Sequence, residues 1–259
     1  MLATVNDLLK LLEELMPSNL AEDWDNVGLM LGRKGKTVKK ILLALDLSKE
    51  VVEQAVAQKI DLIITHHPAI FKKLKRVVDN DWQQDLLLTL AENGIAVYSA
   101  HTNLDCVSAG VNDVLAKLLK LDDIEVLDDS NGLGRIGVVE EASLAEYAQV
   151  VKTALKADYV VVADAGKKVH RVAVCGGAGS DLIDLALAKG ADTLVTGDVK
   201  YHSAQQAVFS GLNIIDAGHQ PTELPVLEKL ADRLSLRLVE RDMDVVVNVA
   251  KETLILRHV

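Results

Sequence analysis

Short apolar runs alternate with amphipathic stretches along most of the chain, and this alternation is typical of an α/β protein. Runs rich in Val, Ile and Leu suit strands of a parallel sheet that is buried on both faces. They predict strands over residues 40–46, 60–65, 95–98, 134–140, 159–163, 171–175, 193–196, 212–215, 236–240 and 245–249. Apolar residues at helical spacing, with capping residues such as Thr4 and Ser143, predict one helix from Thr4 to Pro17 and others over residues 49–59, 81–93, 108–120, 143–156, 181–189, 203–209 and 226–234.

The composition changes at residues 121–131, which are acidic and rich in Asp, and we expect a domain boundary there. The expected domains are a first α/β domain over residues 1–128 and a second over residues 129–235. The C-terminal residues, about 236–259, are candidates for a return to the first domain.

The chain resembles itself when it is shifted by 131 positions. Matching residues then coincide without a gap: residues 41–44 with 172–175, Asp61 with Asp192, and Thr65 with Thr196. A shift of 118 aligns a His-x-x-x-acid pair that begins at His101 with one that begins at His219. Chance similarity between strand–helix–strand units is the alternative, but the repeated pair favours an internal duplication.

Two adjacent histidines follow one expected strand, in the stretch Leu62-Ile-Ile-Thr-His-His-Pro68. Open α/β sheets place their ligand sites at the carboxyl ends of strands. Neighbouring residues of a regular strand point to opposite faces, so His66 and His67 cannot both aim at one point there. Pro68 favours an extended conformation at His67. The pair fits two neighbouring metal ions, or one metal ion and one hydrogen bond; the alternative is a pair of capping or core histidines.

Other ligand-type residues follow further expected strands: His101, Asp105, His219 and Glu223. His101 is a candidate metal ligand, a residue that orients a ligand, or a proton shuttle. Asp105 is either a ligand or a turn or capping residue. Because Pro221 lies between His219 and Glu223, we expect these two in the turn before the next helix rather than in a helical i,i+4 arrangement.

The remaining candidates have simpler interpretations. The segment Leu20-Ala-Glu-Asp-Trp-Asp-Asn-Val-Gly-Leu29 is expected to form a surface turn anchored by Trp24. His202 is expected to form a hydrogen bond beside the site rather than to ligate, and His170 and His258 are expected to be ordinary surface residues.

Imidazole and carboxylate ligands without thiolate suit Zn, Fe, Mn, Co or Ni rather than Ca. We expect two divalent metal ions per chain, with Asp105 or Glu223 as the bridging carboxylate. Two divalent ions with two carboxylates and neutral histidines leave a charge of about +2 in the site. That charge favours a bridging hydroxide and an anionic substrate.

The formal net charge of −10 argues against non-specific binding to nucleic acid or to an anionic membrane. Cys106 and Cys175 have no CxxC spacing, so they predict neither a disulfide framework nor a cysteine metal site. The amino terminus lacks a basic segment followed by an apolar one, and no apolar run approaches the roughly 18 residues of a membrane span. We therefore expect a cytoplasmic protein.

Taken together, several motifs resemble the YbgI-like dinuclear metal proteins, which also carry the name type 2 GTP cyclohydrolase I homologues. The motifs are residues 20–29, Thr65-His-His-Pro68, His101-Thr-Asn-Leu-Asp105, Thr196-Gly-Asp198 with Tyr201-His202, and Gly218-His219 with Thr222-Glu223. The resemblance implies two similar three-layer α/β/α domains related by internal duplication, assembled as a toroidal homohexamer with sites facing an inner cavity. It also implies metal ligands and a site neighbour: His66, His67, Asp105, His219 and Glu223 as ligands, and His101 as the neighbour.

The expected function is that of a dinuclear divalent-metal hydrolase acting on a small anionic substrate, nucleotides included, through a metal-bridged hydroxide and with His101 as the proton carrier. The resemblance implies opening of GTP at the imidazole ring of guanine, and a phosphoesterase is an equally physical interpretation. The sequence has no P-loop or other nucleotide fingerprint. The alternative class is a metal-binding hexameric scaffold or a regulatory, partner-binding protein without turnover. An open coordination position favours the enzyme, and a closed one favours the scaffold.

Overall fold

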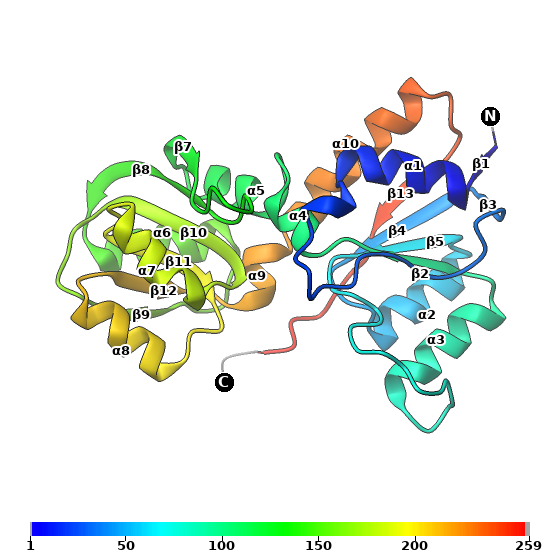
Figure 1. The fold of residues 1–259 in the computed structure, drawn as a ribbon, viewed down its shortest axis with the longest axis horizontal. Coiled ribbons are helices and arrows are strands. Elements are labelled where there is room, and N and C mark those ends of the chain that lie inside the picture. Colours follow the sequence, from blue (N-terminus) through cyan, green and yellow to red (C-terminus); the bar gives the residue numbers. More distant parts are fainter. Residues whose placement is uncertain (1, 257–259) are drawn as a thin grey trace. The chain divides into compact units, whose positions relative to one another are not determined.

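The computed structural model describes residues 2–256, so His258 lies outside the described residues. The chain divides into two compact units, which Figure 1 shows as ribbons. Unit 1 contains the residues up to Val107 together with Leu227–Thr253, and unit 2 contains Ser108–Val226 and the residues from Leu254 on. The return of the C-terminal part to unit 1 thus begins at Leu227, earlier than the expected residue 236.

The expected domain boundary at residue 128 falls inside unit 2. The acidic stretch before it forms strand β7 (Asp122–Val126), which pairs with β8 (Arg135–Ala142). β7 is the edge strand of its sheet, and most of its acidic side chains are exposed. Charged residues are common on edge strands because they discourage pairing with other chains. The acidic composition of this stretch is therefore that of an edge strand and does not mark a linker between domains.

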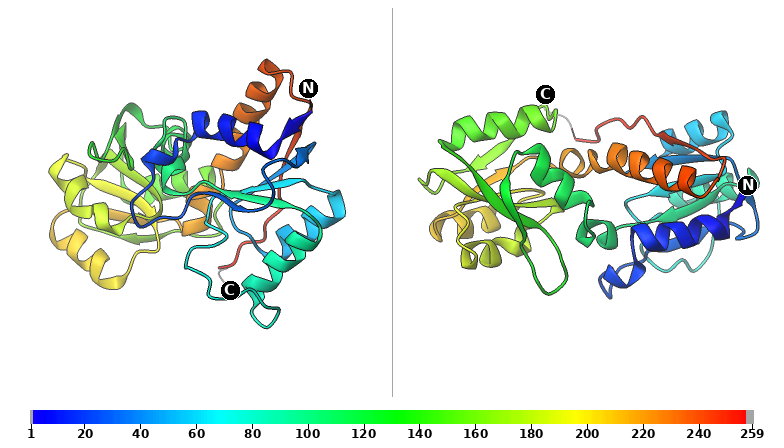
Figure 2. Two further views of the ribbon diagram at one scale, coloured as in Figure 1. Left: turned by 45° about the vertical axis from the view of Figure 1, so that its right-hand side comes forward. Right: turned by 90° about the horizontal axis from the view of Figure 1, so that it is seen from above.

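Unit 1 is built on a five-stranded sheet whose strands are, in sheet order, β13 (Val246–Val249), β4 (Lys40–Ala44), β5 (Leu62–Thr65), β6 (Ala96–Ser99) and β2 (Gly28–Leu31). β2 runs antiparallel to β6, and the other neighbours are parallel. Helices α2 (Lys49–Gln58) and α3 (Trp82–Glu92) lie on one face, and α1 (Val5–Leu15) and α10 (Val226–Glu240) lie on the other, as the views in Figure 2 confirm. Short elements complete the unit: β1 (Ala3–Thr4), η1 (Ser18–Leu20), β3 (Thr37–Val38) and α4 (Thr102–Cys106).

The core of unit 1 explains the unbroken apolar runs of the sequence. Leu42, Ile63 and Val97 from the three central parallel strands pack with Val51 of α2 and Leu87 of α3 in one hydrophobic cluster. Residues 41–45 are all fully buried, because helices cover both faces of this sheet.

Unit 2 contains a six-stranded sheet whose strands are, in sheet order, β7, β8, β10 (Val169–Ala178), β11 (Thr193–Gly197), β12 (Asn213–Asp216) and β9 (Val161–Ala163). Two hydrophobic clusters lie on its two faces. One includes residues of α5 (Val111–Leu118) and α6 (Leu144–Ala154), and the other includes residues of α7 (Ile183–Ala188) and α8 (Tyr201–Phe209). Two short helices complete the unit, η2 (Ser180–Leu182) and α9 (His219–Glu223). Helices on both faces of the sheet give the expected α/β/α layers.

The pairing of the strands confirms the internal duplication. β4 pairs with β5 so that Ile41 lies opposite Leu62, and β10 pairs with β11 so that Val172 lies opposite Thr193. Both pairs of positions are related by the shift of 131. The third strand follows a shift of 117, since Ser99 pairs with Thr65 and Asp216 with Thr196. The shift of 118 that aligns the histidines therefore includes one extra residue after β12.

One expected strand is wrong. Residues 234–238 alternate apolar and polar side chains, but residues 236–240 form the last turns of helix α10. Leu230, Leu234 and Leu238 are buried at helical i,i+4 spacing. Arg237 and Arg241 pair with Glu14 of α1. The helical period of the buried leucines thus decides the conformation of this segment.

Candidate metal centre

The first cluster of ligand-type residues lies in unit 1, where β5 and β6 end. β5 ends at Thr65, and His66 and His67 follow it directly; His101 follows β6 after Ala100. One ring nitrogen from each of these three histidines lies within 4.8 Å of the corresponding atoms of the other two. His66 is almost fully buried, whereas the other two are partly exposed. Because the chain leaves the sheet at Pro68, the side chains of both adjacent histidines reach the same region.

Each of the three histidines has its Nδ1 atom at a hydrogen-bond acceptor. Nδ1 of His66 lies 2.9 Å from the carbonyl oxygen of Ala100, and Nδ1 of His67 lies 2.8 Å from Oδ1 of Asp46. Nδ1 of His101 lies 2.9 Å from Oδ1 of Asp25. Carbonyl and carboxylate oxygens accept but do not donate, so the neutral ring carries its proton on Nδ1. Nε2 then offers a lone pair, as metal-binding histidines do.

Asp25 is the functional residue that the sequence interpretation missed. Its carboxylate accepts hydrogen bonds from His101 and from the backbone and hydroxyl of Thr102, and its side chain is fully buried. Burial by itself raises the pKa of Asp25, but the hydrogen bonds from His101 and Thr102 hold that pKa well below its usual range. Asp25 therefore stays charged and fixes the orientation of the His101 ring.

The expected surface turn is present at residues 23–24, but Trp24 does not anchor it. Trp24 is 61% exposed, and the contacts of Asp25 fix the segment instead. The only signal for Asp25 in the sequence was the acidic composition of this segment. That signal is weak, because a carboxylate that binds a histidine 76 positions away looks like any surface acid in a single sequence.

Asp105 lies in the short helix α4, which the sequence did not predict. Oδ1 of Asp105 lies 3.6 Å from Nε2 of His66, and Asp105 is buried. The i,i+4 spacing from His101 therefore spans the start of a helix, with His101 at its N-cap position. This places His66, His67, His101 and Asp105 together in unit 1.

The support of His67 extends into the returning C-terminal segment of unit 1. The carboxylate of Glu252 accepts hydrogen bonds from the backbone nitrogens of Leu45 and Asp46, at 2.6 and 3.1 Å. Burial raises the pKa of Glu252, although these two amide hydrogen bonds act in the opposite direction. Glu252 thereby holds the turn from which Asp46 reaches His67.

The second cluster lies in unit 2 and is formed by helix α9. Nε2 of His219 lies 3.2 Å from Oε2 of Glu223, at i,i+4 spacing, and Glu223 is 3% exposed. The expectation of a non-helical turn here is wrong, because Pro221 occupies the first turn of α9, where a missing N–H costs nothing. Nδ1 of His219 lies 2.7 Å from Oδ2 of Asp198, so this ring has the same arrangement as the first three.

The Thr196-Gly197-Asp198 motif gives each of its residues a role in unit 2. The Thr196 hydroxyl accepts from the backbone nitrogen of Gly179 and donates to the carbonyl of Gly177. At Gly197 a Cβ atom would lie 2.6 Å from the backbone of His219, so only glycine permits this close approach. Asp198 then holds the imidazole of His219.

Gly177 leaves space next to the two ligand-type side chains of α9. An added Cβ would lie 2.2 Å from Oε1 of Glu223 and 3.2 Å from Nε2 of His219, and the φ of Gly177 is +63°.

The donor atoms in both clusters are imidazole nitrogens and carboxylate oxygens, which are the ligands that divalent transition metals take in open sites. The residues present thus fit divalent metal ions.

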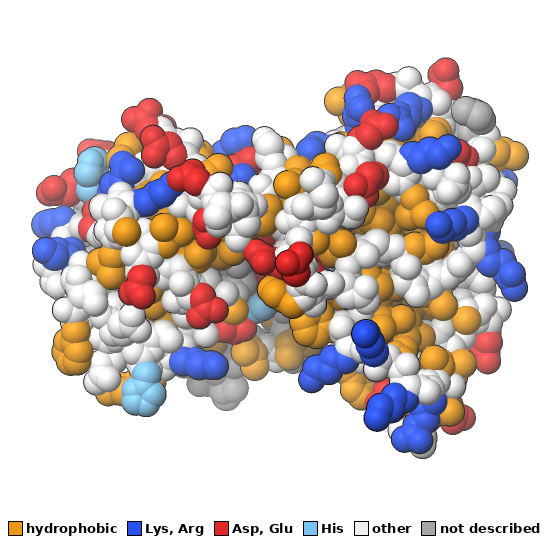
Figure 3. Space-filling view, viewed as in Figure 1, with side chains coloured by type: hydrophobic (Ala, Val, Ile, Leu, Met, Phe, Trp, Pro, Cys, Tyr) orange, Lys and Arg blue, Asp and Glu red, His pale blue; other side chains and the backbone are white. Residues whose placement is uncertain are grey.

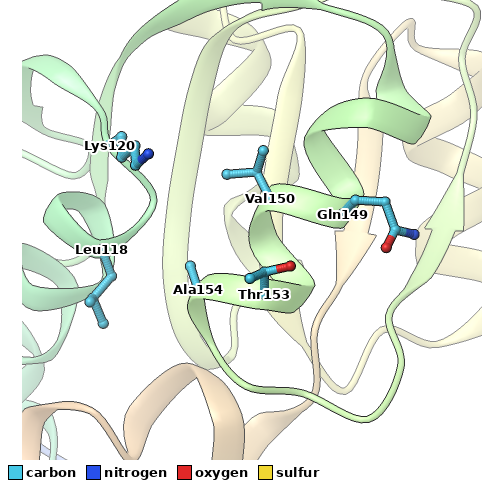
Figure 4. A pocket seen from close by; sticks show the side chains of 6 residues that line it. All are labelled: Leu118, Lys120, Gln149, Val150, Thr153 and Ala154. Atoms are coloured by element: carbon cyan, nitrogen blue, oxygen red, sulfur yellow. The ribbon is translucent and has the colours of Figure 1, made fainter.

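Other candidates lie apart from these clusters. His202 is exposed on α8 beside Tyr201, and Nδ1 of the exposed His170 lies 2.7 Å from the carbonyl oxygen of Val139. A hollow of about 390 Å³ lies in unit 2, and Figure 4 shows the side chains that line it. It is lined by Leu118, Lys120, Gln149, Val150, Thr153 and Ala154. This lining includes no histidine or carboxylate.

Histidine and carboxylate clusters at the strand ends of a duplicated α/β fold define a two-unit protein with candidate metal centres. The chain belongs to the Duf34/NIF3 (NGG1p interacting factor 3) family, whose sequence pattern matches residues 3–253.

Its relatives extend over almost the whole chain. It is 36% identical over 255 residues to the GTP cyclohydrolase 1 type 2 homolog of Clostridium perfringens, with 96% of each chain covered. It is 38% identical to the protein of the same name from Lactococcus lactis, which covers 89% of this chain and 91% of that relative.

Among solved structures, the Bacillus cereus protein related to NIF3 is similar with a TM-score of 0.95, 26% identity and 100% of both chains covered. Protein ybgI is similar with a TM-score of 0.85 and 27% identity, covering 97% of this chain and 99% of ybgI. The expected YbgI-like resemblance is confirmed.

Proposed function

We propose that this protein is a dinuclear divalent-metal hydrolase that acts on a small anionic substrate. The proposed ligands are His66, His67, Asp105, His219 and Glu223. The observation that carries the proposal is the shared arrangement of the histidines: each proposed histidine ligand has its Nδ1 at a carbonyl or carboxylate oxygen. The surface residue His170 also has its Nδ1 at a carbonyl oxygen, but the proposed ligands differ from it because each has further ligand atoms close by. His66 and His67 lie within 4.8 Å of each other's ring nitrogens and of His101, and Nε2 of His219 lies 3.2 Å from Oε2 of Glu223.

The donor set supports Zn, Fe, Mn, Co or Ni rather than Ca. A pair of such ions, when bound, supplies Lewis-acid polarisation of a phosphoryl or carbonyl oxygen and a source of hydroxide near neutral pH. The buried carboxyl groups of Asp105 and Glu223 are the candidates for a bridging position, because their burial leaves them few competing water contacts.

His101 is the proposed proton carrier. Its Nδ1 proton is shared with Asp25, so its Nε2 takes up a proton from one reacting group and returns it to another. Asp25 stabilises the charged ring that forms in between, in the way that a buried carboxylate supports a catalytic histidine.

The curated relatives from Clostridium perfringens and Lactococcus lactis carry the name GTP cyclohydrolase 1 type 2 homolog, and this name supports GTP as a first substrate to test. A phosphoester is the second, because the same pair of ions would stabilise charge on a phosphoryl oxygen.

An assembled form of the protein, the expected homohexamer, is supported by an apolar surface on unit 2. Val161 and Val162 of edge strand β9, together with Tyr201 and Phe209 of α8, line a hollow of about 570 Å³ and are exposed. Large exposed apolar surfaces are typical of interfaces between chains. The same surface is what a scaffold without turnover would use, so assembly alone does not decide between enzyme and scaffold.

Among the described residues, no helix combines the length and the apolar character that crossing a bilayer requires.

A metal-reconstituted activity screen tests the proposal. Wild-type protein and Asp105→Asn are loaded with Zn, Mn, Fe, Co or Ni and offered GTP, other nucleotides and phosphoesters. We expect turnover of at least one compound by the wild type and a loss of at least a hundredfold in Asp105→Asn. Turnover that this substitution leaves unchanged comes from a contaminant, and the absence of turnover with every metal favours the scaffold.

A further inference from the structure

Two large aromatic side chains lie exposed beside the histidine cluster of unit 1. Trp24 is 61% exposed and Phe71 is 48% exposed, and their ring centroids are 6.1 Å apart with an interplanar angle of 70°. Both rings lie edge-on to His101, with centroid distances of 6.1 and 6.4 Å. Adjacent exposed aromatic rings next to a chemical site are typical of a ligand surface rather than of a core.

Hydrogen bonds hold this pair in place before any ligand binds. The backbone nitrogen of Glu22 donates to Oγ1 of Thr102 at 3.0 Å, and Asp25 is fixed by His101. Nδ2 of Asn26 donates to the carbonyl oxygen of Ile70, the residue before Phe71. The segments that carry the two rings are therefore tied to each other and to the cluster, which lowers the entropic cost of binding.

A basic segment follows Phe71 directly. Four of the next five side chains are cationic and exposed: Lys72, Lys73, Lys75 and Arg76. Within residues 2–256, no carboxylate lies within ion-pair distance of any of these four, and the acidic Asp79 comes only after them in the loop. Figure 3 shows Lys and Arg side chains gathered at the lower right, where the loop between β5 and α3 lies in Figure 1. A local excess of positive charge on a chain of net charge −10 indicates an anionic partner.

We propose that this face of unit 1 binds a nucleotide, with the base against Trp24 and Phe71 and the phosphates at the basic segment 72–76. The planar base matches the exposed rings, since stacking on aromatic side chains accepts any base. The phosphates match the cations. Phe71 and Lys72 are consecutive in the chain, so one small ligand reaches both features, and its base lies next to His101. This inference rests on the proposed function because it names the substrate class of that site.

Calorimetric titration of the metal-loaded protein tests this proposal with GTP, ATP, guanosine and inorganic tripolyphosphate as probes. We expect both nucleotides to bind, and guanosine and tripolyphosphate each to bind at least tenfold more weakly. Tripolyphosphate that binds as tightly as GTP overturns the role of the aromatic pair. Guanosine that binds as tightly as GTP overturns the role of the basic segment.

Variants separate the two features. Trp24→Ala is expected to weaken GTP binding about tenfold, the lower part of the range for loss of one stacked base, whereas Trp24→Phe keeps the ring and most of the affinity. The double variant Lys72→Glu with Lys75→Glu is expected to weaken GTP binding at least tenfold and to flatten its dependence on salt. Arg33→Glu with Lys34→Glu is the matched control, since it reverses two exposed charges of the same unit away from the loop. Affinities of the Trp24 and Lys72 variants within twofold of the wild type overturn the proposal.

Two further measurements distinguish this proposal from binding of single-stranded nucleic acid and from the proposed metal function. An oligothymidylate of eight nucleotides that binds at least a hundredfold more tightly than GTP overturns the assignment to a small nucleotide in favour of single-stranded nucleic acid. Repeating the GTP titration after treatment with a chelator separates it from the metal proposal. Protein that binds metal but no nucleotide contradicts only the present inference. Protein that binds nucleotide through Trp24 but never holds metal contradicts only the proposed metal function.

Discussion

Asp61 and Asp192 form the same backbone hydrogen bonds in the two halves of the protein. Oδ2 of Asp61 accepts from the backbone nitrogens of Lys39 and Lys40, at 2.8 and 3.2 Å. Oδ2 of Asp192 accepts from the backbone nitrogens of residues 170 and 171, at 2.9 and 2.7 Å. The two carboxylates and their partners are all related by the shift of 131, so the duplication extends from strand pairing to individual side chains.

The first prediction concerns Asp61 and pH. Burial by itself raises the pKa of Asp61, but hydrogen bonds from Lys39, Lys36 and Lys40 lower it below its usual range. A carboxylate whose folded pKa is depressed stabilises the fold above its unfolded pKa of about 3.9 and loses that effect as pH falls through the folded value. Asp61→Asn should therefore lower the free energy of unfolding by about 1 kcal/mol at pH 7, because the site is partly exposed, and by less at pH 3.

Urea denaturation at the two pH values measures this difference. Glu92→Gln, which neutralises an exposed carboxylate at the end of α3, is the control and should behave as the wild type. A deficit of Asp61→Asn that is as large at pH 3 as at pH 7 would show that the charge of Asp61 is not what stabilises the fold.

The second prediction concerns the space next to Glu223. Gly177→Ala places a Cβ 2.2 Å from Oε1 of Glu223 at a φ of +63°, so it should both strain the backbone and displace the carboxylate. Gly166→Ala is the matched control, since φ there is +73° but no atom lies within 4 Å of the new Cβ. Thermal unfolding should show a loss of about 1 kcal/mol for Gly166→Ala and a larger loss for Gly177→Ala, because only the latter also displaces a buried carboxylate. Metal content should fall only in Gly177→Ala, and equal metal content in the two variants argues against Glu223 as a ligand.

The third prediction concerns the carboxylates that hold the imidazole rings. Asp46→Ala and Asp198→Ala should each lower metal affinity about 10- to 100-fold, because they release Nδ1 of His67 and His219 respectively. Competition with a chromophoric chelator measures the affinity. Asp181→Ala, which removes an exposed carboxylate of unit 2, should leave it unchanged. If all three variants bind metal equally, the orienting role of these carboxylates is wrong.

The fourth prediction concerns assembly. Phe209 is 82% exposed on α8, and Phe209→Asp should place a charge in the proposed interface and shift the protein toward smaller species. Light scattering coupled to size-exclusion chromatography gives the mass of the wild type and the variant. Val150→Asp changes a side chain on α6 that is 39% exposed, and it should leave the mass unchanged. A variant Phe209→Asp with the wild-type mass places the interface elsewhere.

Much of the fold could be predicted because its signals are local. Apolar runs in strands that are buried on both faces, and caps such as the Thr4 and Ser143 boxes, act within a few residues. The placement of histidines at strand ends follows from the same runs. The expected strand over residues 236–240 was misleading, because Leu234-Ser-Leu-Arg-Leu238 alternates like a strand, while the buried Leu234 and Leu238 continue a helical period from Leu230.

The missed parts of the site depend on contacts between distant segments. Asp25 reaches His101 across 76 positions, and Glu252 reaches the backbone of Leu45 across 207 positions. Nothing in the local sequence distinguishes these two acids from exposed ones. Only the closure of the sheet, with β13 of the returning segment beside β4, brings Glu252 to the turn that carries Asp46.

Metal content per chain tests the central claim most directly. Protein purified without chelator, and analysed by inductively coupled plasma mass spectrometry, should contain about two divalent transition-metal ions per chain. Asp105→Ala and Glu223→Ala should each lower that content by at least half, while His170→Ala, which removes an exposed histidine, should match the wild type. A wild type that holds only trace metal after reconstitution with Zn, Mn, Fe, Co or Ni, with Glu223→Ala indistinguishable from it, would contradict the account.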